Sequence, residues 1–160
     1  MAAWRSWPTP TSAPRFGAEL VALARFLIDT SAAARMHHPV VADRLSPLIE
    51  AGLVATCASL DAEALSSARS PGEYERVRAD RRTAYQYLPT EDRHWQQGFD
   101  AQRELARTGR HRSVGIADLL TAVLTGEHQL TLVHYDADFD IAAEVIDFEH
   151  RWVTNRGAVT

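Results

Sequence analysis

Arg25-Phe26-Leu27-Ile28-Asp29-Thr30-Ser31 is a short apolar run that ends in an acid and continues into two hydroxyl residues. A bounded apolar run of this length is typical of a buried strand. Thr30 and Ser31 can turn the chain and cap a helix, because their side-chain oxygens accept hydrogen bonds from free helical amides. The stretch therefore predicts a buried strand followed directly by a helix.

The same alternation of short apolar runs and helical segments continues along the chain. Further strands are expected at residues 53–57, 130–135 and 151–153. Helices are expected at residues 39–51, 59–69, 71–84, 91–107, 116–125 and 137–143. Parallel strands need crossover connections, so this order predicts an α/β layer sandwich with a short parallel sheet flanked by helices. We expect a loose extension at residues 1–24, one domain at 25–153 and a C-terminal tail at 154–160.

Composition and charge exclude several classes of protein. The 160 residues include 17 basic and 21 acidic ones, for a net charge of -4, and every basic residue is arginine. Without lysine there is no amine for a Walker phosphate-binding loop, a Schiff base or lysine general-base catalysis. Cys57 is the only cysteine, so no intrachain disulfide can form and a cytoplasmic location is expected. No apolar stretch approaches the roughly 20 residues that span a bilayer, so we expect no membrane segment.

Acidic residues stand where a parallel sheet binds ligands. Such ligands lie at the carboxyl ends of the strands, and Asp29 and Asp136 directly follow apolar runs. Glu63 and Asp118 lie among apolar residues on predicted helices, and Asp118 is either a helix cap or a metal ligand. Each acid alone has an ordinary structural explanation, but converging carboxylates are stable mainly when a divalent cation neutralises them. All-oxygen ligation favours Mg²⁺ or Mn²⁺ over zinc.

These acids lie in four motifs that together resemble a known family. The motifs are Phe26-Leu27-Ile28-Asp29-Thr30-Ser31-Ala32, Leu60-Asp61-Ala62-Glu63-Ala64-Leu65, Ile116-Ala117-Asp118-Leu119-Leu120-Thr121-Ala122 and His134-Tyr135-Asp136-Ala137-Asp138-Phe139. In order, spacing and flanking residues, they resemble the PIN-domain ribonucleases of the VapC toxin type. The resemblance covers roughly residues 25–153.

The resemblance implies a site, a cofactor and an activity. The implied acidic quartet that binds Mg²⁺ or Mn²⁺ consists of Asp29, Glu63, Asp118 and Asp136, with Asp138 as an additional acid and Thr30 or Ser31 in support. The implied activity is metal-dependent endonucleolytic cleavage of RNA, restrained by a cognate antitoxin protein, in a chain that forms a homodimer. One departure is His134, where many members have threonine, so the hydrogen bond beside Asp136 stays open.

Arginines supply the cations that RNA binding needs. Residues 69–112 hold 10 of the 17 arginines against seven acids, whereas residues 129–150 hold six acids and no arginine. We expect Arg110 and Arg112, just before Asp118, to contact RNA together with His111, because guanidinium groups bind phosphate bidentately. For most other arginines a solvated helix surface with ion pairs one turn apart explains the pattern.

Two other functions stay open on the sequence. The alternative is a non-catalytic PIN-like module that binds RNA or protein, although all four acids of the quartet are intact. A haloacid-dehalogenase-like phosphatase built on Asp136 and Asp138 fits poorly, because that family has its Asp-x-Asp pair early in the chain. Trp95 and Phe99, four residues apart, are expected to form a helix packing stripe rather than a base-stacking platform, on a surface that can also dock a partner chain.

Overall fold

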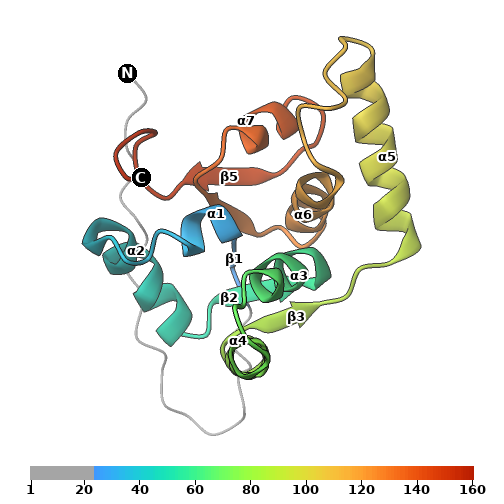
Figure 1. Cartoon of the computed structure of the whole chain (residues 1–160). Coiled ribbons are helices and arrows are strands. Elements are labelled where there is room, and N and C mark those ends of the chain that lie inside the picture. Colours follow the sequence, from blue (N-terminus) through green and yellow to red (C-terminus); the bar gives the residue numbers. More distant parts are fainter. Residues whose placement is uncertain (1–23) are drawn as a thin grey trace, which may run out of the picture.

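A five-stranded parallel sheet forms the centre of the fold (Figure 1). The computed structural model describes residues 24–160, so the extension expected at residues 1–24 lies, except for Ala24, outside the described residues. The strands are β1 (Phe26–Ile28), β2 (Val54–Cys57), β3 (Gln86–Leu88), β4 (Thr131–His134) and β5 (Glu149–Trp152). Their spatial order is β3-β2-β1-β4-β5, and every neighbouring pair is parallel. The chain thus winds outward from β1 in both directions, which places the topological switch point at its carboxyl end.

Seven helices pack on and around this sheet in the part of the chain that is described. They are α1 (Thr30–Ala33), α2 (Pro39–Glu50), α3 (Ala58–Ser66), α4 (Pro71–Ala84), α5 (Asp92–Ala106), α6 (Ile116–Glu127) and α7 (Asp138–Ala142). The predicted α/β layer sandwich with a short parallel sheet is therefore confirmed. Sequence reasoning missed β3 and placed β5 two residues too late, because both are short edge strands with few buried side chains.

The strand β1 separates two hydrophobic layers. Phe26 and Ile28 point to one face of the sheet, where α2 packs with Val41, Leu45 and Leu48. Leu27 points to the other face and packs with side chains of α3, α6 and α7. This alternation follows from the two-residue period of a strand, and it fixes which helices surround the carboxyl end of β1.

Helix α5 packs against α6 through one face that carries small, polar and apolar side chains. The buried positions of α5 are His94, Gly98, Ala101 and Leu105. The expected packing stripe of Trp95 and Phe99 is wrong, because these rings lie one position further round the helix and stay 40% and 47% exposed. Their centroids are 6.2 Å apart, so the two rings contact each other at the surface.

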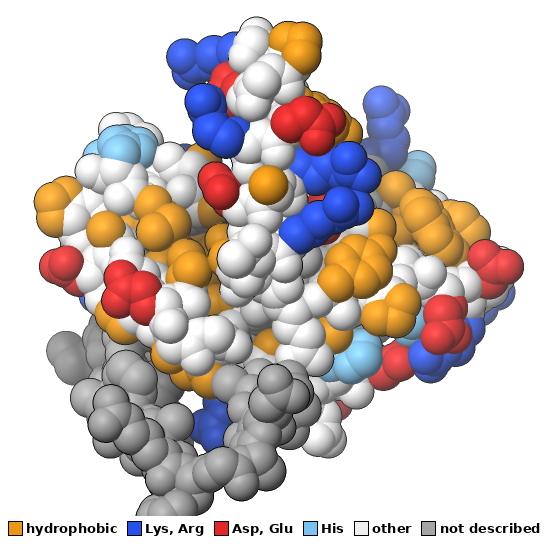
Figure 2. All heavy atoms as spheres, turned by 90° about the horizontal axis from the view of Figure 1, so that it is seen from below, with side chains coloured by type: hydrophobic (Ala, Val, Ile, Leu, Met, Phe, Trp, Pro, Cys, Tyr) orange, Lys and Arg blue, Asp and Glu red, His pale blue; other side chains and the backbone are white. Residues whose placement is uncertain are grey.

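Helix α4 lies outside the two hydrophobic layers and buries none of its side chains fully. It is the lowest helix in Figure 1 and therefore nearest the reader in Figure 2, where charged side chains cover this face next to hydrophobic ones. Ser70 caps its N-terminus, since the Ser70 hydroxyl accepts a hydrogen bond from Glu73 N. None of the described helices is both long and apolar enough to cross a membrane.

Residues 154–160, expected as a tail, pack back against the domain. Val159 is buried in the same layer as α2, and its N–H donates a 3.1 Å hydrogen bond to the Tyr135 hydroxyl. The carbonyl of Thr160 lies 2.9 Å from His38 Nε2. The C-terminal segment thus covers the α2 side of the sheet.

Candidate active site

Asp29 lies at the carboxyl end of β1, with only 4% of its surface exposed. It is the N-cap of α1: one carboxylate oxygen accepts a 2.9 Å hydrogen bond from Ser31 N and a second one from the Ser31 hydroxyl. Burial raises the pKa of Asp29 above its ordinary value against the lowering effect of these two hydrogen bonds, and the charges of Glu63 and Asp136 raise it further. The Asp-Thr-Ser sequence therefore fixes the position of a buried carboxyl group.

Ser31 joins the ends of β1 and β4. Its hydroxyl donates to Asp29 and accepts a 2.9 Å hydrogen bond from Tyr135 N. The parallel register pairs Ile28 with Val133, and Asp29 N donates to the carbonyl of Val133 at 2.9 Å. This register brings Asp29 next to the loop that carries Asp136.

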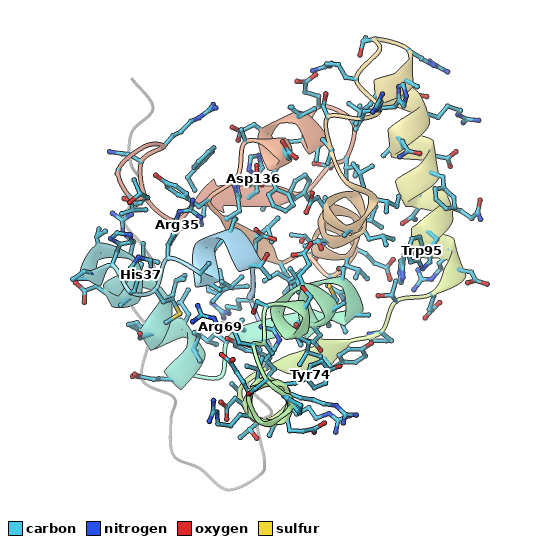
Figure 3. All side chains as sticks on the ribbon, viewed as in Figure 1. Arg35, His37, Arg69, Tyr74, Trp95 and Asp136 are labelled. Carbon is cyan, nitrogen blue, oxygen red and sulfur yellow. The ribbon has the colours of Figure 1, made fainter. Side chains whose placement is uncertain are left out.

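Asp136 lies at the end of β4, between α1 and α7 in the view of Figure 3. Its Oδ1 accepts a 3.0 Å hydrogen bond from Asp138 N, and its own N–H donates to His134 Nδ1 at 3.2 Å. Burial and the charge of Asp136 raise the pKa of Asp138. Asp136 and Asp138 thus enter the site together, at the N-terminal end of α7.

Two helices contribute the remaining acids of the quartet. Glu63 projects from α3, and its Oε2 accepts a 2.7 Å hydrogen bond from the Thr30 hydroxyl. Asp118 stands in the first turn of α6, whose N-cap is Gly115 and not Asp118. The Asp118 carboxyl accepts no hydrogen bond among the described residues, so it does not cap the helical amides. The expected position at the N-terminal end of a helix is confirmed, and there a carboxylate interacts favourably with the helix dipole.

The electrostatics of Asp118 define the site. Burial and, after it, the charges of Asp29, Glu63, Asp136 and Asp138 together raise its pKa from 3.8 to about 7. All five acids singled out in the sequence therefore lie in one neighbourhood, brought together from two strand ends and three helices. Such a set offers only carboxylate oxygens and an excess of negative charge, which fits a hard divalent cation such as Mg²⁺ or Mn²⁺.

His134 is a part of the site whose role the sequence left open. The ring is fully buried between Phe139 and Trp152, at centroid distances of 5.0 and 5.2 Å. Its Nε2 lies 2.9 Å from His150 Nδ1, while its Nδ1 accepts from Asp136 N. Burial, followed by the charge of His150, lowers the pKa of His134 to about 4. His134 Nδ1 is thus the hydrogen-bond acceptor behind the backbone of Asp136.

Arg110 and Arg112, the expected RNA contacts, lie between α5 and α6. The Arg110 guanidinium makes two hydrogen bonds to the Glu144 carboxylate, at 2.9 and 2.5 Å. Arg112 is exposed. The pairing of Arg110 with an acid 34 residues further along the chain could not be read from sequence spacing.

Comparison with known proteins agrees with this geometry. The family model described as "PIN domain" matches residues 26–145. Ribonuclease VapC21 of Mycobacterium tuberculosis is 40% identical over 133 residues, which cover 83% of this chain and 96% of that protein. Ribonuclease VapC51 of the same species is 36% identical over 136 residues, which cover 84% and 97% of the two chains.

Solved structures show the same fold at lower identity. A chain of the DNA-bound VapBC structure from Salmonella typhimurium has a TM-score of 0.66 and 15% identity, with 82% of this chain and all (100%) of that chain covered. A chain of FitAcB from Neisseria gonorrhoeae has a TM-score of 0.58 and 19% identity, with coverage of 78% and 96%. With a family model across most of its length and relatives of 36–40% identity, this chain belongs to the PIN-domain family, among its VapC ribonucleases.

Proposed function

We propose that the protein is a metal-dependent endoribonuclease, the toxin component of a toxin–antitoxin pair. The observation that carries this proposal is the convergence of five carboxyl groups near the carboxyl end of β1, where burial and the four neighbouring charges raise the pKa of Asp118 to about 7. Repulsion between these carboxylates lowers the stability of the folded state unless a cation neutralises them. The names of the mycobacterial relatives, both ribonucleases, give the chemistry in which that cation would act.

The divalent ion would be held by Asp29, Glu63, Asp118 and Asp136, with Asp138 beside them. When bound, Mg²⁺ or Mn²⁺ lowers the pKa of a water molecule and stabilises charge on the attacking and leaving oxygens of a phosphodiester. The chain's other residues orient the ligands. Ser31 holds Asp29, and Thr30 holds Glu63, each through its hydroxyl group.

Metal ligands act best when a second set of hydrogen bonds fixes their direction. The N–H of Asp138 directs one oxygen of Asp136, so the other oxygen stays available. His134 accepts the N–H of Asp136 and thereby fixes the backbone that carries this acid. No side chain is needed as a nucleophile, which agrees with a single cysteine, Cys57, that is buried.

An antitoxin protein is the expected partner. The solved neighbours include VapBC complexes from several bacteria, one of them described as a member of a family of toxin–antitoxin systems. We propose that this chain likewise pairs with a cognate antitoxin, forms a homodimer and acts on RNA in the cytoplasm. The binding-only alternative, a PIN-like module without activity, is less favoured because all the acids of the quartet are present and close together.

A cleavage assay tests the nuclease. Purified protein is incubated with single-stranded and structured RNA in Mg²⁺, in Mn²⁺ and in EDTA, beside the variants Asp29→Asn and Asp118→Asn. We expect cleavage with a divalent ion and none with EDTA or with either variant. Asp43→Asn, an exposed acid of α2, is the matched control and should cleave as the wild type does. Cleavage that survives in both site variants would exclude the proposed site.

A further inference from the structure

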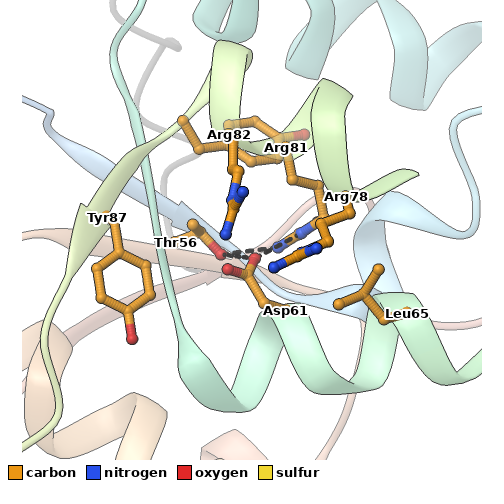
Figure 4. A pocket seen from close by; sticks show the side chains of 8 residues that line it. Thr56, Asp61, Leu65, Arg78, Arg81, Arg82 and Tyr87 are labelled. Carbon is orange, nitrogen blue, oxygen red and sulfur yellow. Dashed lines mark hydrogen bonds and ion pairs between the residues drawn. The ribbon is translucent and has the colours of Figure 1, made fainter. Parts of the chain in front are cut away.

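A pocket of about 430 Å³ lies on the side of α3 that faces away from the acid site. Figure 4 shows Arg78, Arg81 and Arg82 extending from α4 toward Asp61, while Tyr87, on β3, lines the pocket at one side. Its size is in the range of pockets that hold small ligands or single groups of larger ones. With three guanidinium groups and one carboxylate, its lining is positively charged.

The single acid of the pocket is already neutralised. Arg81 Nε donates to Asp61 Oδ1 at 2.6 Å, and Arg81 also donates to the Thr56 hydroxyl at 2.7 Å, which in turn donates to Asp61 at 2.8 Å. Only 14% of the Arg81 side chain is exposed, so this triangle forms the floor of the pocket. The net charge above the floor comes from Arg78 and Arg82.

Arg78 and Arg82 stand one turn apart on α4, at the rim. Like charges at this spacing destabilise a helix, and an anion between them would relieve the repulsion. Arg78 has one exposed contact with Glu75 at 3.7 Å. The guanidinium group of Arg82 makes no ion pair or hydrogen bond with the residues that the structure describes. Both guanidinium groups are therefore available to an anion of the size of a phosphate.

Aromatic rings complete the pocket. Tyr87 is 55% exposed on the edge strand β3. Tyr85 lies beneath the Arg81 guanidinium, 5.0 Å from the guanidinium carbon to the ring centroid. Proteins hold single-stranded nucleic acid by combining arginines, which bind the phosphates, with aromatic rings, on which the bases stack. On the face shown in Figure 2, basic side chains lie next to hydrophobic ones.

Helix α3 connects this pocket to the acid site. Asp61 and Glu63 are two residues apart, so they project on nearly opposite sides of the helix, Asp61 into the pocket and Glu63 toward Thr30. A helix with its side chains is roughly 10 Å across. A single RNA strand a few nucleotides long can therefore cross α3 and occupy both places.

We propose that the pocket between α3, α4 and β3 binds one nucleotide of an RNA strand, with a phosphate between Arg78 and Arg82 and a base on Tyr87. This inference rests on the proposed ribonuclease function, because it supplies that function with a substrate subsite away from the cleaved bond. An acidic protein segment could pair with the two arginines, but it would leave the exposed ring of Tyr87 without a stacking partner.

RNA binding in the absence of divalent ions tests the pocket. The probe is a fluorescein-labelled single-stranded RNA of mixed sequence, followed by fluorescence anisotropy in EDTA at several salt concentrations. We expect Tyr87→Ala to weaken binding about 5- to 100-fold, the effect of removing one base stack. For Arg78→Ala/Arg82→Ala we expect weaker binding and a salt dependence whose logarithmic slope falls by about 0.7 for each phosphate that the variant no longer neutralises.

Arg76→Ala is the matched control, since Arg76 is an exposed arginine of the same helix that does not line the pocket. It should bind RNA as the wild type does, and all variants should keep the wild-type melting temperature. If the double alanine variant melts at a lower temperature, Arg78→Gln/Arg82→Gln replaces it, because glutamine keeps a long polar side chain and removes the charge. Wild-type RNA affinity in the Tyr87 and arginine variants would overturn the proposal.

Two further results separate this proposal from the ribonuclease function. If the wild type cleaves RNA and the pocket variants bind and cleave equally well, the pocket proposal fails and the nuclease stands. If the pocket variants lose RNA binding while the wild type cleaves nothing, the subsite stands and the nuclease fails. Variants that bind RNA normally but no longer retain a co-expressed antitoxin would assign the pocket to a protein partner and overturn the proposal.

Discussion

The surroundings of Asp118 disfavour the ionised form of its carboxyl group. Its folded pKa of about 7 exceeds the ordinary 3.8, so between about pH 4 and pH 7 the folded state binds more protons than the unfolded state. Stability contributed by the protonated carboxyl is therefore lost as pH rises through this window. In EDTA, we expect the melting temperature of the wild type to fall relative to that of Asp118→Asn from pH 5 to pH 8, so that the variant melts above the wild type at pH 8. The comparison with the variant removes the opposite effect of His134, whose lowered pKa makes the folded state more stable as pH rises from about 4 to 6.5.

Divalent ions provide the control for this prediction. Mn²⁺ should raise the melting temperature of the wild type at pH 8, because a ligand that binds only the folded state stabilises it. Asp118→Asn should respond much less, since it lacks one ligand. Equal melting curves for the two proteins at pH 8, with and without Mn²⁺, would show that the carboxyl of Asp118 neither repels its neighbours nor binds metal.

Ser31 positions a ligand without being one. Ser31→Ala removes the hydroxyl that holds Asp29 and leaves Tyr135 N without its acceptor. Removal of such an orienting partner typically weakens metal affinity by about 10- to 100-fold. We expect isothermal titration calorimetry with Mn²⁺ to show this weaker affinity. Ser67→Ala, an exposed hydroxyl at the end of α3, should leave the affinity unchanged.

The site residues could be predicted from sequence to different degrees. Asp29 and Asp136 were placed by the rule that ligands lie at strand ends, and Glu63 and Asp118 stood out as acids among apolar residues of predicted helices. The resemblance to the family joined these four, with Asp138, into one metal site. The partners of these acids could not be predicted. Ser31 meets Tyr135 only because β1 pairs with β4 in one particular register, and His134 meets His150 through the register of β4 with β5. Spacing along one chain does not specify such registers.

At the scale of the elements, the helices could be predicted from their periodicity and end residues better than the strands could be from their short apolar runs. The Pro39 start and the Gly52 end of α2 follow from local chemistry, since Gly52 has φ of +67°. By contrast, β3 has three residues of which only Leu88 is buried, so no apolar run marks it. In α5 the mistake was to follow the largest side chains, Trp95 and Phe99, although the face one position earlier is buried and Gly98 on it lets Ile116 and Leu120 of α6 approach closely.

The backbone of α6 approaches the segment before β5 closely at Gly126, which gives a prediction for the packing of these two segments. A Cβ atom on Gly126 would lie 2.5 Å from the Asp147 carbonyl oxygen, so backbone must move to admit it. We expect Gly126→Ala to destabilise the protein by about 1–3 kcal/mol, measured by urea unfolding. Gly72→Ala, a helical position with no atom within 4 Å of the new Cβ, should be neutral or slightly stabilising. Equal stability of the two variants would contradict the packing described.

The attachment of α4 depends on polar contacts, because the helix buries no side chain fully. Arg81→Ala removes the guanidinium that joins α4 to Asp61 and Thr56. We expect faster amide hydrogen exchange along α4 and a destabilisation of about 1–3 kcal/mol from the unpaired partners. Exchange in α6 should stay slow. Unchanged exchange in α4 would mean that contacts other than this ion pair hold the helix.

At the scale of the whole molecule, the C-terminal segment closes the layer around α2. Val159 is part of that hydrophobic layer, although the segment was expected only as a tail. Val159→Ala should cost about 1–2 kcal/mol of unfolding free energy, as other deletions of buried methyl groups do. The control is Thr160→Ala, which keeps the carbonyl that meets His38. A melting temperature unaffected by Val159→Ala would show that this segment does not contribute to the core.

The hydrogen bond between Ser31 and Tyr135 joins residues 104 positions apart. Asp136 follows directly, in the last part of the 160-residue chain, so the first acid of the site is synthesised long before the last. While the chain is still on the ribosome, Asp29 has no β4 beside it and Asp136 has not been made. A nascent chain therefore holds no complete set of these acids until translation has passed Asp138.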